Sequence, residues 1–185
     1  MPANIPQGTP ASRDDLYTVF DAHKIAYETV EHPPIFTVEE GADIKASIAG
    51  GHTKNLFLKD KAGAYFLICA LGETQIKINR LHPLLGCKRL SFGKEEYLYE
   101  HLGVRPGSVT LFSIINDPDQ AVTLILDAAL LKHSRVNFHP LENTATTGIS
   151  TNDMLRFVTA MEREPILVDF SDFDAPQIRP QDLSE

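Results

Sequence analysis

The chain of 185 residues has no tryptophan, only two cysteines and no apolar run long enough to cross a membrane. A membrane-spanning helix needs about 20 consecutive apolar residues. The longest apolar runs here, such as residues 64–71, have the length of a strand. The N-terminal segment also lacks the basic start and apolar block of a secretory signal. We therefore expect a protein without membrane segments that stays in the cytoplasm.

Metal ligands and disulfide partners are equally scarce. Cys69 and Cys87 have no closely spaced partners, so the sequence predicts free thiols. Because Cys69 lies in an apolar run, we interpret it as buried and inert and not as a nucleophile. None of the seven histidines pairs at i, i+4 or lies at ligand spacing from a cysteine. We expect no metal and no other cofactor.

Several catalytic motifs are missing as well. The sequence contains neither of the glycine-rich phosphate loops GxGxxG and GxxxxGK[ST], and it lacks the GxSxG and HExxH signatures. Nucleotide hydrolysis, hydride transfer and ordinary serine-hydrolase chemistry therefore lose their main support.

The net charge of −8 argues against a nucleic-acid partner until the charge is followed along the chain. Residues 52–105 carry nine basic and five acidic side chains, so this segment alone has a net charge of +4. It could form a phosphate-facing patch on an acidic protein, and the alternative is an ordinary solvated surface. The nine basic residues are Lys54, Lys59, Lys61, Lys77, Arg80, Lys88, Arg89, Lys94 and Arg105.

Apolar periodicity and turn residues predict more strands than helices. Several strands are joined by loops too short for a helical crossover, so much of the sheet must be antiparallel. The expected class is α+β, with a mixed, largely antiparallel sheet or partly closed barrel and surrounding helices. Helices are expected over 12–24, 37–50, 79–85, 94–102 and 150–161, and strands over 27–30, 55–60, 64–71, 88–92, 108–115, 121–130, 136–139 and 165–170.

Two further expectations concern chain organisation. An Asn-Asp-Pro-Asp turn predicts a hairpin between the strands at 108–115 and 121–130. The length suits a single compact domain better than two. We place that domain at residues 12–170, between a flexible N-terminal tail (1–11) and an acidic C-terminal tail (171–185).

The first segment that could carry chemistry is GGHTKNLFLKD, residues 50–60. Lys54 follows a glycine pair and stands at the expected start of a strand. A lysine there could hold a phosphate or carbonyl oxygen as a mobile point charge, while Asn55 or loop amides supply directed donors. The alternative is a solvated lysine at a strand end.

The second segment is VNFHPLENTATTGIS, residues 136–150. Its small hydroxyl and amide groups could line a narrow polar pocket at the positive end of the last helix, where a glycine allows close approach. A long turn whose side chains bond their own backbone is the alternative. The candidate residues are His139, Asn143, Thr146, Thr147, Gly148 and Ser150.

Four segments, HTKNLFLKDKAG, FLICAL, CKRLSFG and VNFHPLENTATTGIS, together resemble the YbaK/ProX superfamily, and specifically its freestanding prolyl-tRNA editing proteins. The resemblance covers roughly residues 12–170. It implies a trans-acting hydrolase that cleaves the ester between a wrong amino acid, alanine, and the 3′ end of proline tRNA in translation quality control. It also implies transient association with prolyl-tRNA synthetase.

The resemblance assigns roles to the two segments. Lys54 matches the lysine that family members need for deacylation. Substrate-binding residues would be His52, Asn55, His139, Asn143, Thr146, Thr147, Gly148 and Ser150. Positioning and electrostatic stabilisation can carry much of the rate when water attacks an activated ester. We hypothesise that amides near Gly148 face the oxyanion, and a general-base lysine is the rival mechanism.

Two other functions stay open at this point. One is a related deacylase acting on Cys-, Ser- or Thr-charged tRNA, which pocket volume would separate from alanine editing. The other is a non-catalytic module that binds tRNA or an amino acid. A small pocket suits alanine editing, because overpacking a rigid pocket excludes the larger proline.

Overall fold

The fold was analysed in a computed structural model that describes residues 8–34, 41, 44, 46–172, 174 and 176–178. The helix expected over 37–50 lies largely outside the described residues, as do residues 1–7 of the N-terminal tail and most of the C-terminal tail. Within the described part of the chain, no helix is long and apolar enough to cross a membrane.

Nine strands of the described residues form one mixed sheet in the order β1-β7-β6-β2-β3-β5-β8-β9, with β4 paired to β2. Five of the strand pairs are antiparallel, and β2·β6, β3·β5 and β5·β8 are parallel. The expected α+β class with a largely antiparallel sheet is confirmed. The strands are β1 (Tyr27–Glu31), β2 (Gly51–Asp60), β3 (Tyr65–Leu71), β4 (Leu90–Phe92), β5 (Val122–Asp127), β6 (Arg135–Phe138), β7 (Ala145–Ser150), β8 (Ile166–Asp169) and β9 (Gln177–Ile178).

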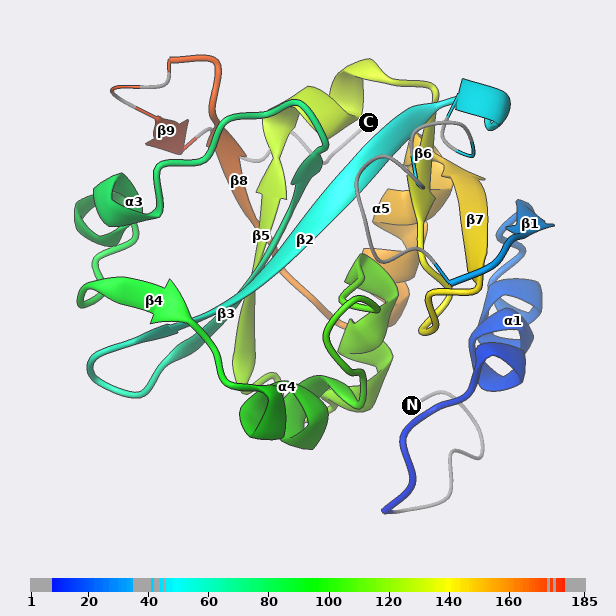
Figure 1. The fold of residues 1–185 in the computed structure, drawn as a ribbon, viewed down its shortest axis with the longest axis horizontal. Coiled ribbons are helices and arrows are strands. Elements are labelled where there is room, and N and C mark those ends of the chain that lie inside the picture. Colours follow the sequence, from blue (N-terminus) through cyan, green and yellow to red (C-terminus); the bar gives the residue numbers. More distant parts are fainter. Residues whose placement is uncertain are drawn as a thin grey trace.

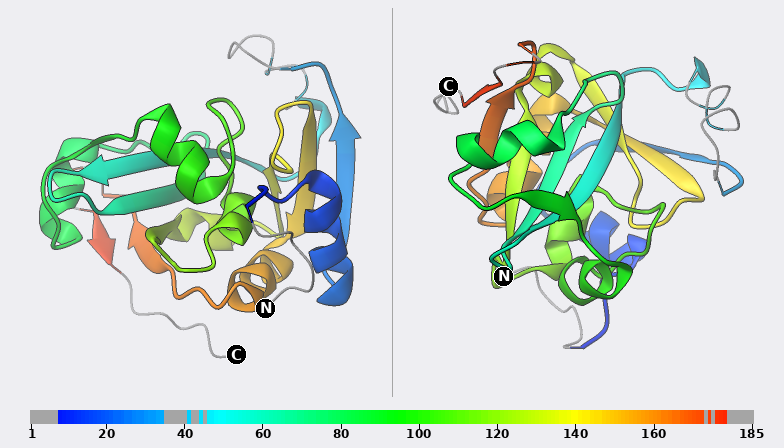
Figure 2. Two further views of the ribbon diagram at one scale, coloured as in Figure 1. Left: turned by 90° about the horizontal axis from the view of Figure 1, so that it is seen from below. Right: turned by 60° about the vertical axis from the view of Figure 1, so that its left-hand side comes forward.

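Helices cover both faces of this sheet. Helices α1, α4 and α5 pack into one core and α3 packs into another on the opposite face. Figure 2 shows α1 beside β1 and β7. Ser12 begins α1 with a capping box shared with Asp15, and Gly103 ends α4 in the left-handed conformation, both as the sequence predicts. The helices are α1 (Arg13–Ala22), α3 (Ile78–Leu84), α4 (Glu95–Leu102) and α5 (Thr151–Ala160), with 3-10 helices η1 (Leu111–Asn116) and η2 (Ala128–Lys132).

Strand β2 joins the two halves of the sheet. In Figure 1 it runs diagonally between the β6-β7-β1 group and the β3-β5-β8 group. It forms a hairpin with β3, and the short turn contains Gly63 at a φ of 100°. Ten residues long, it begins at Gly51 and not at the expected residue 55. Lys54 therefore lies inside the strand and not at its start.

Side-chain alternation along β2 and β3 separates two apolar cores. Phe57, Leu67 and Cys69 belong to the larger core, which also packs against α1, α4, α5 and η1. A smaller core beneath α3 and β4 contains Leu58, Phe66 and Ile68, which are the sequence neighbours of those three residues. Two neighbouring residues of β2 therefore face different environments.

The strand predicted over 108–115 is wrong, and so is the hairpin that would follow it. Residues 111–116 form η1, which begins where the Thr110 hydroxyl accepts from Phe112 N. Burial on all sides removes the solvent face that would distinguish a strand from a helical turn in this apolar run. Strand β5 instead pairs in parallel with β3 and β8.

Residues 145–150, expected as part of a polar loop, form strand β7 between β1 and β6. The sequence ATTGIS does not alternate between apolar and polar residues, because its first five residues are all buried. Its two threonines have the β-branched shape that suits a strand. Ser150 caps α5 through Asp153 N, as predicted.

Phe20 lies at the centre of the larger core, fully buried, with edge contacts to Phe112 at 5.1 Å and Phe157 at 5.6 Å between ring centroids. We expect Phe20→Ala to lower the free energy of unfolding by about 3–5 kcal/mol, because it leaves a cavity among rings. Chemical denaturation measures this change. Phe92→Ala is the control, since Phe92 is 65% exposed and should change stability by less than about 0.5 kcal/mol.

Asp60 is buried and accepts hydrogen bonds from the main-chain N–H groups of Lys88, Ala64 and Ala62, which hold the pKa of its carboxyl below the ordinary value. This stabilisation is complete above the unfolded pKa of about 3.9 and is lost as pH falls through the lower folded value. We expect Asp60→Asn to lower Tm at pH 7, with the deficit shrinking below about pH 4. A deficit independent of pH would contradict this, and Asp119→Asn at an exposed site is the control.

Candidate functional site

A small cavity of about 210 Å³ lies at the outer edge of β2. It is bounded on one side by β2, on a second by the segment after α4, and on a third by the residue that follows β6. The two candidate segments of the sequence, residues 50–60 and 136–150, therefore meet at this cavity. The lining residues are Thr53, Lys54, Asn55, Gly107, Val109 and His139.

Lys54 is half-buried, and its ammonium is held in place from one side. Nζ donates to the carbonyl oxygen of Gly72 at 3.0 Å and to that of Thr74. An ammonium carries three donors, so one remains for a further acceptor. A fixed point charge with a remaining donor is suited to holding a phosphate or a carbonyl oxygen.

The carbonyls that hold Lys54 are themselves fixed by a buried carboxylate. Asp127, 1% exposed, accepts from the Thr74 hydroxyl at 2.5 Å and from Leu71 N at 3.3 Å. The bond from Leu71 N ties the end of β5 to the end of β3. Asp127 also accepts from Ala129 N at 2.9 Å and so caps η2. Asp127 therefore positions Lys54 through the turn after β3.

Asn55 reaches the cavity from β2, and His139 reaches it from the position just after β6. The side-chain Oδ1 of Asn55 is buried and has no hydrogen-bond partner among the described residues. His139 Nδ1 lies 2.9 Å from the carbonyl oxygen of Ala145, so this nitrogen carries the proton. The carbonyl fixes the orientation of the His139 ring against the cavity.

Gly107 brings the main chain close to the cavity. Its φ of 91° is one that residues with a side chain rarely adopt. The space in front of it is closed by Asn143, whose Nδ2 lies 3.7 Å from the position a Cβ would take. Asn143 therefore lies next to the cavity wall, although it does not line the cavity.

Two other predicted site residues, His52 and Thr146, lie behind the residues that line the cavity. His52 is half-buried on β2, and its Nε2 lies 3.0 Å from the carbonyl oxygen of Ile48. Thr146 is buried, and its hydroxyl bonds His32 Nε2 at 2.9 Å. The His32 ring in turn lies 6.1 Å from the His139 ring, centroid to centroid. Thr146 is therefore connected to the cavity through His32.

Thr147, Gly148 and Ser150 do not line the cavity. Thr147 is fully buried in a hydroxyl network with Tyr17 and Thr29. Ser150 caps α5.

Gly148 lies inside β7, opposite Glu28 of β1 and Asn137 of β6. A strand pairs with β7 on each side at this position, so the N–H and C=O of Gly148 face a neighbouring strand whichever way they point. The geometry gives no support to oxyanion-facing amides near Gly148. Its lack of a side chain has a packing reason. A Cβ here would lie 2.4 Å from Arg135 Nε and 2.5 Å from Asn137 Oδ1.

The sequence reading missed three of the six lining residues: Thr53, Gly107 and Val109. Pro106-Gly107 was interpreted only as a turn, and Val109 fell in the wrongly predicted strand. A glycine in a turn before an apolar run carries no signal for a ligand pocket. The position of this loop beside β2 comes from long-range packing.

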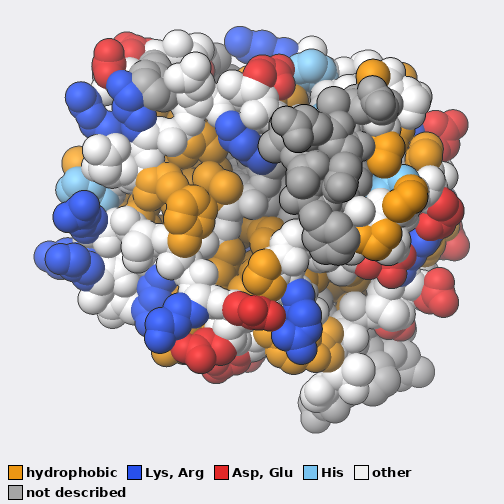
Figure 3. Space-filling view, viewed as in Figure 1, with side chains coloured by type: hydrophobic (Ala, Val, Ile, Leu, Met, Phe, Trp, Pro, Cys, Tyr) orange, Lys and Arg blue, Asp and Glu red, His pale blue; other side chains and the backbone are white. Residues whose placement is uncertain are grey.

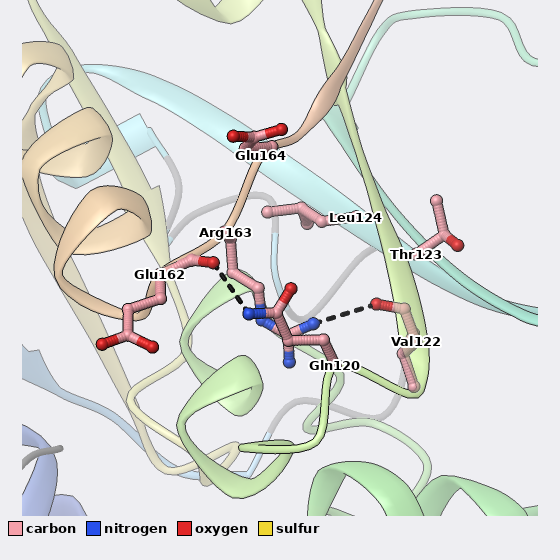
Figure 4. A pocket seen from close by; sticks show the side chains of 7 residues that line it. All are labelled: Gln120, Val122, Thr123, Leu124, Glu162, Arg163 and Glu164. Atoms are coloured by element: carbon pink, nitrogen blue, oxygen red, sulfur yellow. Dashed lines mark hydrogen bonds between the residues drawn. The ribbon is translucent and has the colours of Figure 1, made fainter.

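A larger cavity of about 410 Å³ lies elsewhere, between the start of β5 and the connection from α5 to β8 (Figure 4). Its polar groups serve the fold. Gln120 Nε2 donates to the carbonyl oxygen of Glu162 at 2.9 Å, and the buried Arg163 pairs with Asp117 at 2.7 Å. The carboxylates of Glu162 and Glu164 line the opening, which disfavours an anionic ligand.

The described residues offer few groups suited to metal binding or thiol chemistry. Across the described ranges, no three His, Cys, Asp or Glu residues gather where they could hold a metal ion. Cys69 is fully buried, and burial raises the pKa of its thiol well above the ordinary value. Burial also raises the pKa of Cys87. Neither thiol is activated as a thiolate nucleophile.

Comparison with known families gives an independent result. The model of the aminoacyl-tRNA editing domain family matches residues 32–157, a range that contains all six residues lining the cavity. The chain belongs to this family. The match includes Lys54, Asn55, Gly107, Val109 and His139.

Individual relatives agree with the family match. Prolyl-tRNA synthetase associated domain-containing protein 1 of Mus musculus is 40% identical over 163 residues, covering 85% of this chain and 96% of that protein. Prolyl-tRNA editing protein ProX of Acetoanaerobium sticklandii is 34% identical over 141 residues, covering 76% and 86%. The expected membership of the YbaK/ProX superfamily is confirmed.

The fold is also found among solved structures. A crystal structure described as a trans-editing enzyme for prolyl tRNA synthetase superposes with a TM-score of 0.64. The match covers 92% of this chain and 99% of that one, at 16% sequence identity. At this identity the likeness shows a shared fold.

Proposed function

We propose that this editing domain is a trans-acting deacylase that hydrolyses Ala-tRNA(Pro). The observation that carries the proposal is the meeting of Lys54, Asn55 and His139 around one small cavity at the edge of β2. Membership of the editing family, and a relative named as a prolyl-tRNA editing protein, support the reaction class and the tRNA. The name of another relative, a prolyl-tRNA synthetase associated protein, supports transient association with that synthetase.

The size of the cavity supports alanine as the amino acid. Pockets for drug-sized ligands occupy about 300–1,000 Å³, whereas this one measures about 210 Å³. Val109 and His139 restrict it on the sides away from β2. A cavity of this size suits a small aminoacyl group such as alanyl, and exclusion of proline would depend on contacts between its ring and the cavity wall.

The proposed reaction is hydrolysis of an ester by water. The water oxygen bonds to the carbonyl carbon of the ester, and the electrons of the C=O double bond move to the carbonyl oxygen. The bond between the carbonyl carbon and the ribose oxygen then breaks. The ribose oxygen takes a proton, leaving free alanine and a tRNA with an intact 3′ end. A substrate hydroxyl assists the water, so no protein nucleophile is required.

Lys54 contributes as a cation in this mechanism. Two of its N–H donors are bonded to carbonyl oxygens of Gly72 and Thr74. The third can bond the terminal adenosine phosphate or the ester carbonyl and stabilise developing negative charge. Carbonyl oxygens accept hydrogen bonds and cannot donate them, so two of them beside Nζ stabilise a positive charge there, which favours the electrostatic role over a general-base role.

One part of the surface suits a polyanionic substrate. Figure 3 shows basic side chains around an apolar patch in the region of β2, β4 and α3. Four of the nine cations in residues 52–105 pair with carboxylates, namely Lys77, Arg80, Lys94 and Arg105. Among the described residues, Lys61, Lys88 and Arg89 form no ion pair and remain for phosphate contacts.

Lys54→Ala tests the central residue. We expect the wild type to hydrolyse Ala-tRNA(Pro) but not Pro-tRNA(Pro), and the variant to lose about 10²–10³-fold in rate, the usual effect of removing one donor to a developing oxyanion. Release of radiolabelled amino acid measures both reactions. Lys54→Arg should also lose activity, because a guanidinium does not fit the two carbonyls as an ammonium does.

Lys132→Ala is the matched control, since Lys132 is exposed and does not line the cavity. Full activity of Lys54→Arg would remove a specific lysine role. Binding of tRNA without turnover by the wild type would favour a binding module. Turnover of Cys-, Ser- or Thr-charged tRNA in place of Ala-tRNA(Pro) would move the assignment to a related deacylase.

Val109→Ala tests selection by size. We expect the preference for Ala-tRNA(Pro) over Pro-tRNA(Pro), expressed as a ratio of kcat/KM, to fall by about 10-fold to 200-fold, since small changes in pocket volume are worth ~1–3 kcal/mol. Val30→Ala, at a 40% exposed site on β1, is the control. Unchanged discrimination in Val109→Ala would exclude this wall as the determinant.

A further inference from the structure

The outer edge of β2 is paired only at its two ends. Strand β6 pairs with Gly51 and His52, and β4 pairs with residues 58–60. Between these two neighbours, the middle of β2 has a ladder partner only on its other side, where β3 pairs with residues 53–59. The sheet therefore contains a gap of a few residues at the middle of β2.

The hydrogen-bond pattern identifies the main-chain groups that face this gap. His52 O accepts from Gly72 N at 2.8 Å and Asp60 N donates to Ala64 O at 2.9 Å, so the even-numbered residues of β2 bond β3. In an antiparallel ladder the intervening residues point the other way. Phe57 O confirms this alternation, because it accepts from Gly93 N at 2.9 Å on the outer side.

Asn55 is the odd-numbered residue at the centre of the gap. Its main-chain N–H and C=O point outward, where neither β4 nor β6 reaches it. No other described residue forms a hydrogen bond with either group. Unpaired main-chain groups inside a protein are uncommon, and this pair faces the cavity that Asn55 lines.

We propose that the main-chain N–H of Asn55 is an oxyanion donor of the deacylase, an inference that rests on the proposed function. An N–H donor in the cavity wall can bond only an acceptor, and the ester carbonyl oxygen is the acceptor that gains negative charge during attack by water. The donor is held in a strand, so it needs no reorganisation as the charge develops.

Lys54 and this N–H act from different directions. Lys54 and Asn55 are adjacent, so their side chains leave β2 on opposite faces. The N–H itself lies in the plane of the sheet, at the strand edge between the two faces. A carbonyl oxygen at this edge can receive the N–H, and Lys54, which lines the same cavity, contributes positive charge.

Amide hydrogen exchange tests the geometry without any substrate. In NMR spectra of the full chain, we expect the Asn55 amide to exchange at least about 100-fold faster than the amides of Lys54 and Leu56, which bond β3. A slow Asn55 amide would mean that the group is already paired, and this would overturn the proposal.

Asn55→Pro compared with Asn55→Ala tests the chemistry. Both variants lose the side chain, but only proline loses the N–H, and proline is tolerated where an edge N–H makes no ladder bond. The extended conformation of Lys54 within β2 also suits the residue before a proline. On Ala-tRNA(Pro), we expect kcat to be about 10²–10³-fold lower for Asn55→Pro than for Asn55→Ala, with similar KM.

Equal kcat values in the two variants, with an active wild type, would overturn the oxyanion role alone. An inactive wild type would overturn the proposed function and this inference with it. Thermal unfolding checks that Asn55→Pro is folded. If it is not, replacement of the Lys54–Asn55 amide by an ester removes the same N–H while keeping the Asn55 side chain, and the same loss of kcat is expected.

Discussion

The antiparallel pairing of β2 with β3 is the constraint on which the rest of the molecule depends. Its register sets Lys54 opposite Ala70 and Asn55 opposite Cys69. A slip by one residue would exchange the two faces of β2. It would turn Lys54 toward the larger apolar core and so bury an unpaired charge, which is costly. The buried apolar residues of both cores therefore hold the polar residues of the cavity in place.

Buried aspartates fix the turns around this central pair. Asp60, Asp117 and Asp127 are 5%, 4% and 1% exposed, and each accepts main-chain N–H groups at the end of a strand. Asp117 also neutralises the buried Arg163. Part of the acidity of this chain is thus structural. Its net charge of −8 describes poorly the basic segment at residues 52–105.

An open strand edge usually invites pairing with another chain. Here the opening is short, because β4 and β6 cover both ends of β2. Gly107, Val109 and His139 stand around the remaining gap. The space admits a small ligand and leaves no length for a further strand, so an exposed edge can serve recognition without promoting aggregation.

Local patterns in the sequence determined much of the fold and part of the site. The Ser12 cap, the β2–β3 hairpin, the Ser150 cap and the buried state of Cys69 all follow from residues close together in the chain. The family was also readable from sequence, because several segments together carry a specific pattern. Lys54, Asn55 and His139 were identified on that basis and lie at one cavity.

Only the tertiary structure decided what surrounds those residues. The segments at 108–115 and 145–150 were misread because burial on all sides removes the periodicity that separates strand from helix or loop. The gap at Asn55 depends on where β4 and β6 end. The cavity wall includes Gly107 and Val109, which follow Lys54 by some 50 residues in the sequence but lie beside it in the fold. Such contacts arise from long-range packing, which no local pattern of residues encodes.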